Sequence, residues 1–185
     1  MDPRIVAKEF YFFRHAATDL HAKGLACGGG SDVPLSEAGL QEARAAAKIF
    51  RKNPQKIKTI FSSSLLRAIQ TADIVHDVVD VKLRVFPHFA ERHLGDWEGK
   101  PVAEIEGFSA FAPTIPRGEA YAAFEKRVGE GLVIALGTAQ VSLIVSHGFV
   151  AAVIQRILGA PEVSAERCRL LHFTRGDAGW SVRLA

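Results

Sequence analysis

Arginine and histidine side chains follow three of the most apolar stretches of this sequence. Arg14 and His15 come directly after the aromatic run Phe10–Phe13, Arg67 lies a few residues after IKTIFSS, and His147 directly follows VSLIVS. A buried arginine is costly unless it is paired, and a histidine needs hydrogen-bond partners, so a core alone requires neither. Guanidinium groups suit phosphate oxygens, and these four side chains together would make an anion pocket.

The apolar stretches are expected to be strands that alternate with helices. Predicted strands cover residues 10–13, 57–63, 82–89 and 141–146, with two more around a Gly/Asp turn in 168–185; predicted helices cover 36–50, with Ser36 as N-cap, 64–79, 118–136 and 148–158. This alternation favours an α/β fold, a three-layer α/β/α sandwich with a mostly parallel central sheet. Parallel strands end at one edge of the sheet, where ligands collect, so Arg14, His15, Arg67 and His147 are expected to meet there.

The overall composition is that of a globular protein, and it excludes some classes of partner. The chain has 185 residues without repeats or a linker-like tract, so a single domain over residues 1–185 is expected. It is 48% hydrophobic and 23% charged. The net charge of +3 comes from scattered Lys and Arg residues, which predicts no nucleic-acid partner. A small anionic molecule remains a fitting partner, because a local cluster of charge matters more than the total.

The two cysteines and the apolar runs bear on the compartment. Cys27 and Cys168 are too few for a disulfide framework, so reduced thiols in a cytoplasm are expected. The first 13 residues lack the apolar region of a signal peptide. No apolar run reaches the ~18 residues of a membrane span, so no membrane partner is predicted.

Six segments in a fixed order resemble one known family. The sequence is similar to the histidine phosphatase superfamily, also called phosphoglycerate-mutase-like, between about Phe10 and Val150, in the segments FFRHAAT, GGSDVPLSEAGLQEA, FSSSLLRAIQTA, ERHLGDWEG, PRGEAYAAFEKRV and VSHGFV. Each segment alone would be a weak signal, whereas six in order are strong. The resemblance implies phosphoryl transfer through a phosphohistidine.

The resemblance also suggests a role for each residue. His15 would be the nucleophile, Arg14, Arg67 and His147 would bind the substrate phosphate, and Glu91 would be the general acid. The chemistry of the residues agrees: a neutral imidazole is a usable nucleophile, and nearby arginines disfavour its protonated form while they neutralise phosphate charge. Glu91 would need a raised pKa, for which burial and the neighbouring cations act in opposite directions.

Some positions depart from the family pattern or have ambiguous roles. Ala16, Ala17 and Ala120 replace the usual Gly, Glu and Ser, and His21 replaces the usual Asn, so His21 is only a possible phosphate contact. Thr18 and Ser62 are expected either to donate to phosphate or to cap helices. The remaining two expectations concern carboxylates: Glu98 is expected to be structural and paired with an arginine, and Glu119 to cap or charge a helix N-terminus.

The predicted function is a phosphomonoesterase that acts on a small phosphorylated metabolite without a cofactor or metal. The other histidines lack metal-ligand spacing. One alternative is a cofactor-dependent phosphoglycerate mutase, against which the short segment from Trp97 to Pro116 argues. A phosphohistidine-protein phosphatase would not need Glu91, and a catalytically silent phosphate-binding module would not need the full residue set. The identity of the substrate is left open.

Overall fold

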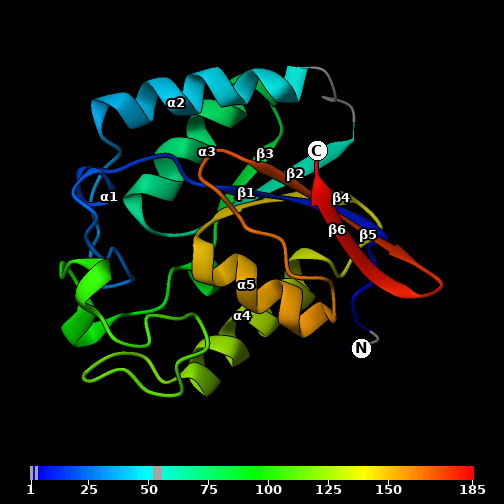
Figure 1. Ribbon diagram of the computed structural model, residues 1–185. Helices are drawn as coiled ribbons and strands as arrows, with labels where there is room; N and C mark the ends of the chain where they lie inside the picture. The colour runs from blue at the N-terminus through cyan, green and yellow to red at the C-terminus, as the bar shows by residue number, and fades with distance from the viewer. Residues whose placement is uncertain (1, 3, 52–55) are drawn as a thin grey trace.

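The computed structural model describes residues 2, 4–51 and 56–185 (Figure 1). Its strands are β1 (Glu9–Arg14), β2 (Ile57–Ser62), β3 (Lys82–Val85), β4 (Val141–Ser146), β5 (Leu170–Gly176) and β6 (Gly179–Leu184). Its helices are α1 (Asp19–Ala22), α2 (Glu37–Ala47), α3 (Leu66–Val79), α4 (Tyr121–Ala135) and α5 (Gly148–Leu158), with 3-10 turns η1 (Lys48–Arg51), η2 (Pro87–Phe89), η3 (Gly95–Trp97) and η4 (Val102–Glu104).

The six strands form one sheet in the order β3-β2-β4-β1-β5-β6. The pairs β3-β2, β2-β4 and β4-β1 are parallel, whereas β5 runs antiparallel to both β1 and β6. Figure 1 shows α2 and α3 on one face of the sheet and α4 and α5 on the other. The predicted α/β/α sandwich with a mostly parallel sheet is therefore confirmed.

Strand β1 shows why the sheet needs a layer of helices on each face. Phe10 and Phe12 lie in a hydrophobic core with residues of α4 and α5, whereas Tyr11 and Phe13 lie in a second core with residues of α3 and η1. Successive side chains of a strand point to opposite faces, so an unbroken aromatic run buries surface on both sides. The same burial fixes where β1 ends and where Arg14 emerges.

The strand predicted over 82–89 and the helix predicted over 118–136 are both shorter in the structure. The strand predicted over 82–89 ends at Val85, because Pro87 has no N–H for the ladder and begins the 3-10 turn η2. The helix predicted over 118–136 begins only at Tyr121, because the chain before it turns at Arg117, which has φ 55°. Ser36 is the N-cap of α2, as predicted, and accepts from the N–H of Gly39.

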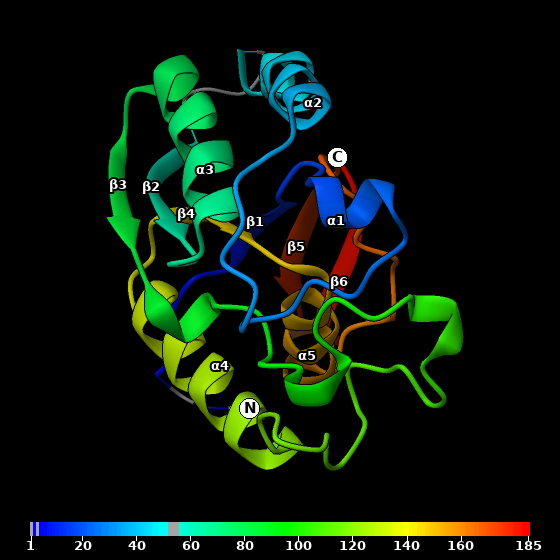
Figure 2. The ribbon, with the colours of Figure 1, turned by 90° about the vertical axis from the view of Figure 1, so that its left-hand side faces the viewer.

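Within the described part of the chain, helices that combine the length and apolarity needed to cross a membrane are absent. Figure 2 looks onto the side of the sheet where β1 turns into the segment with α1, and the long connection between β3 and α4 lies beside it. These two connections, together with the start of α5, surround the exits of the parallel strands.

Candidate active site

The exits of β1, β2 and β4 lie next to one another at the carboxyl edge of the sheet. Arg14 at the end of β1 is in register with Ser146 at the end of β4, and the N–H of His15 donates to the Ser146 carbonyl at 2.9 Å. On the other side of β4, the N–H of Ser63 donates to the Val145 carbonyl at 2.9 Å. The three exits are thus tied together by backbone hydrogen bonds that continue the sheet.

The hydrogen bonds of His15 determine which of its two ring nitrogens carries the hydrogen. Its Nδ1 lies 2.7 Å from the Ala16 carbonyl oxygen, which can only accept, so Nδ1 carries the hydrogen. Its Nε2 then holds a lone pair, to which Nε–H of Arg67 donates at 3.3 Å. Burial, followed by the charges of Arg67 and Arg14, holds the pKa of His15 well below its ordinary value. The imidazole is therefore neutral, with its lone pair on Nε2.

Arg67 is fully buried at the start of α3 and is held by a glycine-rich loop. Its terminal nitrogens donate to the carbonyls of Ser31 at 2.7 Å and Gly28 at 3.1 Å. That loop packs closely on the chain around Glu91, because a Cβ on Gly29 would lie 2.4 Å from the Glu91 carbonyl oxygen. The glycines of ACGGGSD thus let the loop that holds Arg67 contact the chain that carries Glu91.

Arg14 and His147 each have a buried nitrogen without a partner among the described residues. Arg14 donates from Nη1 to the Ala165 carbonyl at 3.0 Å, but its Nε is unpaired. His147, whose ring centroid lies 4.9 Å from that of His15, has Nε2 at 2.7 Å from Ser63 Oγ. Ser63 Oγ also accepts from the N–H of Leu65, and Nδ1 of His147 has no partner among the described residues. Unsatisfied buried donors are costly unless a ligand binds them.

Glu91 is buried beside this cluster, and both of its carboxyl oxygens accept backbone hydrogen bonds. Oε1 accepts from the N–H of Arg92 at 3.0 Å, and Oε2 from the N–H of Phe149 at 3.2 Å. Burial raises the pKa of Glu91, and this outweighs the two hydrogen bonds and the charges of Arg67 and Arg14, which lower it. The balance that the sequence left open thus raises the pKa of Glu91, which is the direction that a general acid requires.

Arg127 of α4 holds the chain around Glu91 in place. Its guanidinium donates to the carbonyls of His88, Ala90 and Glu91 at 3.0, 2.7 and 3.1 Å. The same group forms a two-point ion pair with the Glu119 carboxylate at 2.7 and 2.8 Å. Of the two roles predicted for Glu119, the helix cap is wrong, because α4 is preceded by Ala120 without a side-chain cap and the carboxylate pairs with Arg127. The other role, a negative charge near the helix N-terminus, stays a prediction.

Thr18 and His21, the two possible phosphate contacts, lie at the border of the site. Thr18 caps α1 by accepting from the N–H of His21, and its Oγ1 lies 2.8 Å from Nδ1 of that histidine. The His21 ring lies 5.3 Å from that of His15, and burial followed by the Arg14 charge lowers the pKa of His21 to about 4. His21 is therefore close to the nucleophile but uncharged at neutral pH.

Two further expectations are corrected by the hydrogen bonds. Glu98 pairs with no arginine in the described part of the chain: its carboxylate accepts from the N–H groups of Gly28, Gly30 and Leu94. It thereby fastens the glycine-rich loop, because carboxylates satisfy several N–H donors at once. The predicted role of Ser62 as a helix cap is wrong, because α3 begins after Leu65 without a side-chain cap and the Ser62 hydroxyl donates to the adjacent Ser63 carbonyl at 2.9 Å. Its hydrogen bond to phosphate stays a prediction.

Two residues of the site were missed at the sequence level. Ser63, the partner of His147, is one of three consecutive serines after β2, and its position directly at the strand exit was an available signal. Arg127 had no such signal. It lies eight residues after Glu119 in an ordinary amphipathic helix, and only the tertiary structure brings it to the Glu91 chain.

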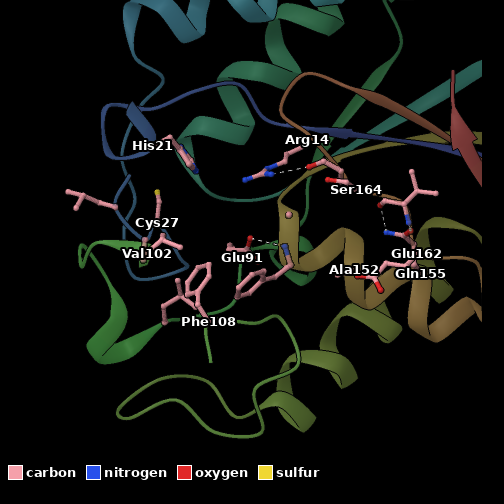
Figure 3. A pocket seen from close by; sticks show the side chains of 17 residues that line it. Arg14, His21, Cys27, Glu91, Val102, Phe108, Ala152, Gln155, Glu162 and Ser164 are labelled. Carbon is pink, nitrogen blue, oxygen red and sulfur yellow. Dashed lines mark hydrogen bonds between the residues drawn. The ribbon is translucent and has the colours of Figure 1, made fainter. Parts of the chain in front are cut away.

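A cavity of about 420 Å³ opens beside Arg14 and Glu91 (Figure 3). Its walls come from the segments around His21 and Phe108, from the start of α5 and from residues 162–165. In Figure 3, Glu91 lies between Arg14 and Phe108, with Cys27 toward one end and Glu162 toward the other. Burial raises the pKa of the Cys27 thiol, so this wall residue is protonated and unreactive at neutral pH. Space for a ligand thus adjoins the buried cluster.

A family model and several known proteins match this chain. The model described as histidine phosphatase superfamily (branch 1) matches residues 10–183. An agropine synthesis reductase of Rhizobium rhizogenes is 33% identical over 98% of the chain but only 43% of its own length, so the chain spans less than half of that relative. An adenosylcobalamin/alpha-ribazole phosphatase of Salmonella typhimurium is 30% identical over 93% of the chain and 88% of its length.

A solved structure of a mycobacterial glucosyl-3-phosphoglycerate phosphatase in complex with VO3 is also similar. It is 25% identical, with a TM-score of 0.76 over 96% of this chain and 97% of that one. That solved structure thus has a fold similar to that of this chain.

Proposed function

Since the chain belongs to the histidine phosphatase superfamily, whose members are phosphatases or mutases, we propose that it hydrolyses a small phosphate monoester through a phosphohistidine on His15. One observation carries this proposal. The lone pair on Nε2 of a buried, neutral His15 lies among Arg14, Arg67 and His147, two of which have a buried nitrogen without a partner in the described chain.

In the first half-reaction, Nε2 of His15 attacks phosphorus as the bond to the leaving oxygen breaks. The carbonyl of Ala16 stabilises the positive charge that develops on the ring through Nδ1–H. Arg14 and Arg67 neutralise charge on the equatorial oxygens, and the unpaired Nδ1 of neutral His147 adds a hydrogen bond to them. Positioning and charge of this kind supply most of the catalysis. Protonated Glu91 gives its proton to the leaving oxygen, which departs as an alcohol.

In the second half-reaction, water attacks the phosphohistidine. Glu91, now a carboxylate, takes a proton from the water as its oxygen bonds to phosphorus and the bond to Nε2 breaks. Inorganic phosphate leaves, and the imidazole and the protonated carboxyl return to their starting states. The raised pKa of Glu91 supports both roles, because it lies closer to neutral pH than that of an ordinary glutamate.

Hydrolysis is favoured over the mutase alternative by the walls of the cavity. A mutase must also bind the second anionic group of its substrate. Arg14 is the sole permanent cation among the described residues that line the cavity. It is already assigned to the transferred phosphate, together with His15, Arg67 and His147, and we call these four residues the phosphate cluster. The intact Glu91 argues against a phosphohistidine-protein phosphatase, whose leaving group needs no acid, and the complete residue set argues against a silent binding module.

We also propose that the reaction needs no metal and takes place in a cytoplasm. Arginine and histidine side chains supply the positive charge that metal ions supply in other phosphatases. Free thiols at Cys27 and Cys168 support a reducing compartment. Activity after dialysis against a chelator tests the first statement: loss of turnover that a divalent cation restores would contradict it.

The test of the main proposal is to trap phosphorus on His15. Wild-type protein quenched during turnover of p-nitrophenyl phosphate should carry an acid-labile phosphoryl group, and His15→Ala should carry none and lose turnover. His172→Ala is the matched control, because His172 lies on β5 with its Nε2 paired to Glu9. Near wild-type turnover in a folded His15→Ala variant would refute the proposal.

A further inference from the structure

The cavity beside the phosphate cluster has mainly apolar walls. Its lining beyond Arg14 and Glu91 consists largely of aliphatic and aromatic side chains, namely Leu25, Ala26, Leu94, Val102, Phe108, Phe149, Ala152, Val163 and Ala165. Ligand pockets of such composition bind the apolar body of a ligand and fix its orientation through a few polar groups. In this cavity the phosphate cluster supplies the polar groups at one side. The apolar walls are therefore where the leaving group of the substrate would bind.

Two aromatic side chains line the same cavity as Glu91, the proposed general acid. The backbone N–H of Phe149 donates to Glu91, and the ring of Phe149 lies 5.2 Å from that of Phe108 at an interplanar angle of 48°. The Phe108 ring also lies 5.9 Å from that of Trp97. Figure 3 places Phe108 on the side of Glu91 away from Arg14. A group attached to the oxygen that Glu91 protonates therefore enters an aromatic wall.

The charges on the remaining wall exclude an acidic leaving group. His21 is neutral, since its pKa is about 4, and the far rim carries the exposed carboxylate of Glu162. A second phosphate or a carboxylate on the substrate would therefore face a like charge and find no matching cation in the described lining. Like charges placed against a ligand are an effective way to reject it.

The wall that carries Glu162 is held in place by a buried glutamine. Gln155 of α5 donates from Nε2 to the Val163 carbonyl at 3.1 Å and accepts at Oε1 from the N–H of Val163 at 2.6 Å. Both ends of the amide thus fix the loop next to Glu162 at the cavity edge. A wall fixed in advance selects ligands by shape, because little ordering entropy is lost when they bind.

We propose that the substrate is a phosphomonoester whose leaving group is uncharged or cationic and carries a planar apolar ring, which packs on Phe108 and Phe149. This inference rests on the proposed phosphatase function and adds the class of substrate. Esters of polyols and of hydroxy acids are poor substrates, because they offer the aromatic wall no apolar surface and, in the second case, bring a carboxylate toward Glu162.

Three esters that all release a primary alkoxide isolate the effect of the leaving group. We compare kcat/KM for benzyl phosphate, glycerol 1-phosphate and 3-phosphoglycerate. Benzyl phosphate should be favoured over glycerol 1-phosphate by about tenfold or more, the amount expected when one ring is removed from water. 3-Phosphoglycerate should be the poorest of the three. Equal values for all three esters would overturn the inference.

Two aromatic substitutions test the proposed wall. Phe108→Ala should reduce the preference for benzyl phosphate over glycerol 1-phosphate by about fivefold, because the ring loses its packing partner. Phe111→Ala is the matched control: Phe111 lies in the same connection but packs on Tyr121 and Arg156. It should leave the ratio unchanged. An unchanged ratio in Phe108→Ala, or equal losses of preference in both variants, would overturn the inference.

A charge reversal tests the rim. Glu162→Arg should raise kcat/KM for 3-phosphoglycerate relative to glycerol 1-phosphate by about twofold to fivefold, the range for a partly exposed ion pair. A ratio that does not rise would overturn the selective role of Glu162. Failure of the proposed function itself looks different: no ester, p-nitrophenyl phosphate included, would then phosphorylate His15, whereas failure of this inference alone leaves phosphorylation intact without a preference for the ring.

Discussion

The two sides of the cavity are built from different kinds of structure. On the phosphate side, His15, Arg67 and His147 are at most 2% exposed and lie where buried strands end or the following helices begin. On the leaving-group side, Phe108 and Glu162 lie outside helices and strands, in the connections that precede α4 and follow α5, and Phe108 is half-buried and Glu162 exposed. Backbone hydrogen bonds of the sheet fix the first set, whereas side-chain packing and a few hydrogen bonds fix the second.

Because of this difference, the residues proposed to transfer phosphorus and the residues proposed to select the leaving group lie on different parts of the fold. The groups proposed to transfer phosphorus cannot move without disturbing the central strands, so their geometry is set by the fold. The connections around Phe108 and Glu162 can change in sequence while the sheet stays intact, because loops tolerate substitution better than the elements they join. Glu91 lies at the border between the two sides and is held by both, through Phe149 of α5 and through Arg127 of α4.

Substitution of Glu91 should have the largest effect on activity, and the effect should depend strongly on the leaving group of the ester. Glu91→Gln cannot supply a proton, so turnover of benzyl phosphate should fall by about 10²–10⁴-fold. Phosphorylation of His15 by p-nitrophenyl phosphate should fall much less, since nitrophenolate leaves without a proton. Pre-steady-state measurement should show a retained burst of nitrophenol followed by slow dephosphorylation.

Glu91→Ala is the companion variant for this measurement. Both oxygens of Glu91 accept backbone N–H groups, so a glutamine there places an NH₂ group against one of these donors. The same pattern in both variants would assign the effect to the missing proton. Equal loss of the first half-reaction for the two esters would mean that Glu91 shapes the pocket and delivers no proton.

A smaller effect is expected from substitution of Arg127, which holds the backbone segment around Glu91 in place. Arg127→Lys keeps a positive charge but cannot reach three carbonyls and the Glu119 carboxylate together. We expect kcat for benzyl phosphate to fall about tenfold, because Glu91 is displaced from the leaving oxygen. The acidic limb of the pH–rate profile should shift, and the burst with p-nitrophenyl phosphate should persist.

The control for this variant is an arginine with an exposed ion pair. Arg169→Lys alters an arginine that pairs with Glu166 on the surface, and such pairs contribute little. Its activity should match the wild type. An Arg127→Lys variant with lower stability but unchanged kcat and pH profile would show that Arg127 is structural and does not position Glu91.

The smallest effect concerns stability against pH. Burial and the arginine charges hold the pKa values of His15 and His147 well below 6.5, so the unfolded chain binds more protons than the folded one as pH falls through 6.5. The free energy of unfolding should therefore decrease from about pH 7 toward pH 5. Calorimetry in a phosphate-free buffer should show this decrease in Tm, and His15→Ala should reduce it.

A substitution on the leaving-group side is the control for the change of Tm with pH. Phe108→Ala removes no titratable group, so its decrease in Tm over the same pH range should equal that of the wild type. If His15→Ala retained the full decrease, the buried histidines would not be its source, and other groups would have to account for it.

The fold and the phosphate side could be predicted from the sequence to a large extent. Phe10–Phe13 is a buried strand, and the chain continues into His15 as the apolar pattern indicated. Arg67 and His147 approach His15 because parallel strands end at a common edge, so the positions of three strand ends along the chain were enough. Local periodicity determines strands and helices, and a parallel sheet converts their ends into neighbours.

The tertiary structure alone decided what depends on partners far apart in the chain. Glu98 accepts from Gly28, 70 residues away, where the sequence suggested an arginine as partner. Whether burial or charge dominates the pKa of Glu91 follows only from how the connections enclose it, as does the contact of Arg127 with its backbone. The orientation of one carbonyl, that of Ala16, decides which nitrogen of His15 holds the lone pair. Side-chain type and spacing name the groups that can react, but distances and solvent exclusion set their protonation, and these exist only once the loops are packed.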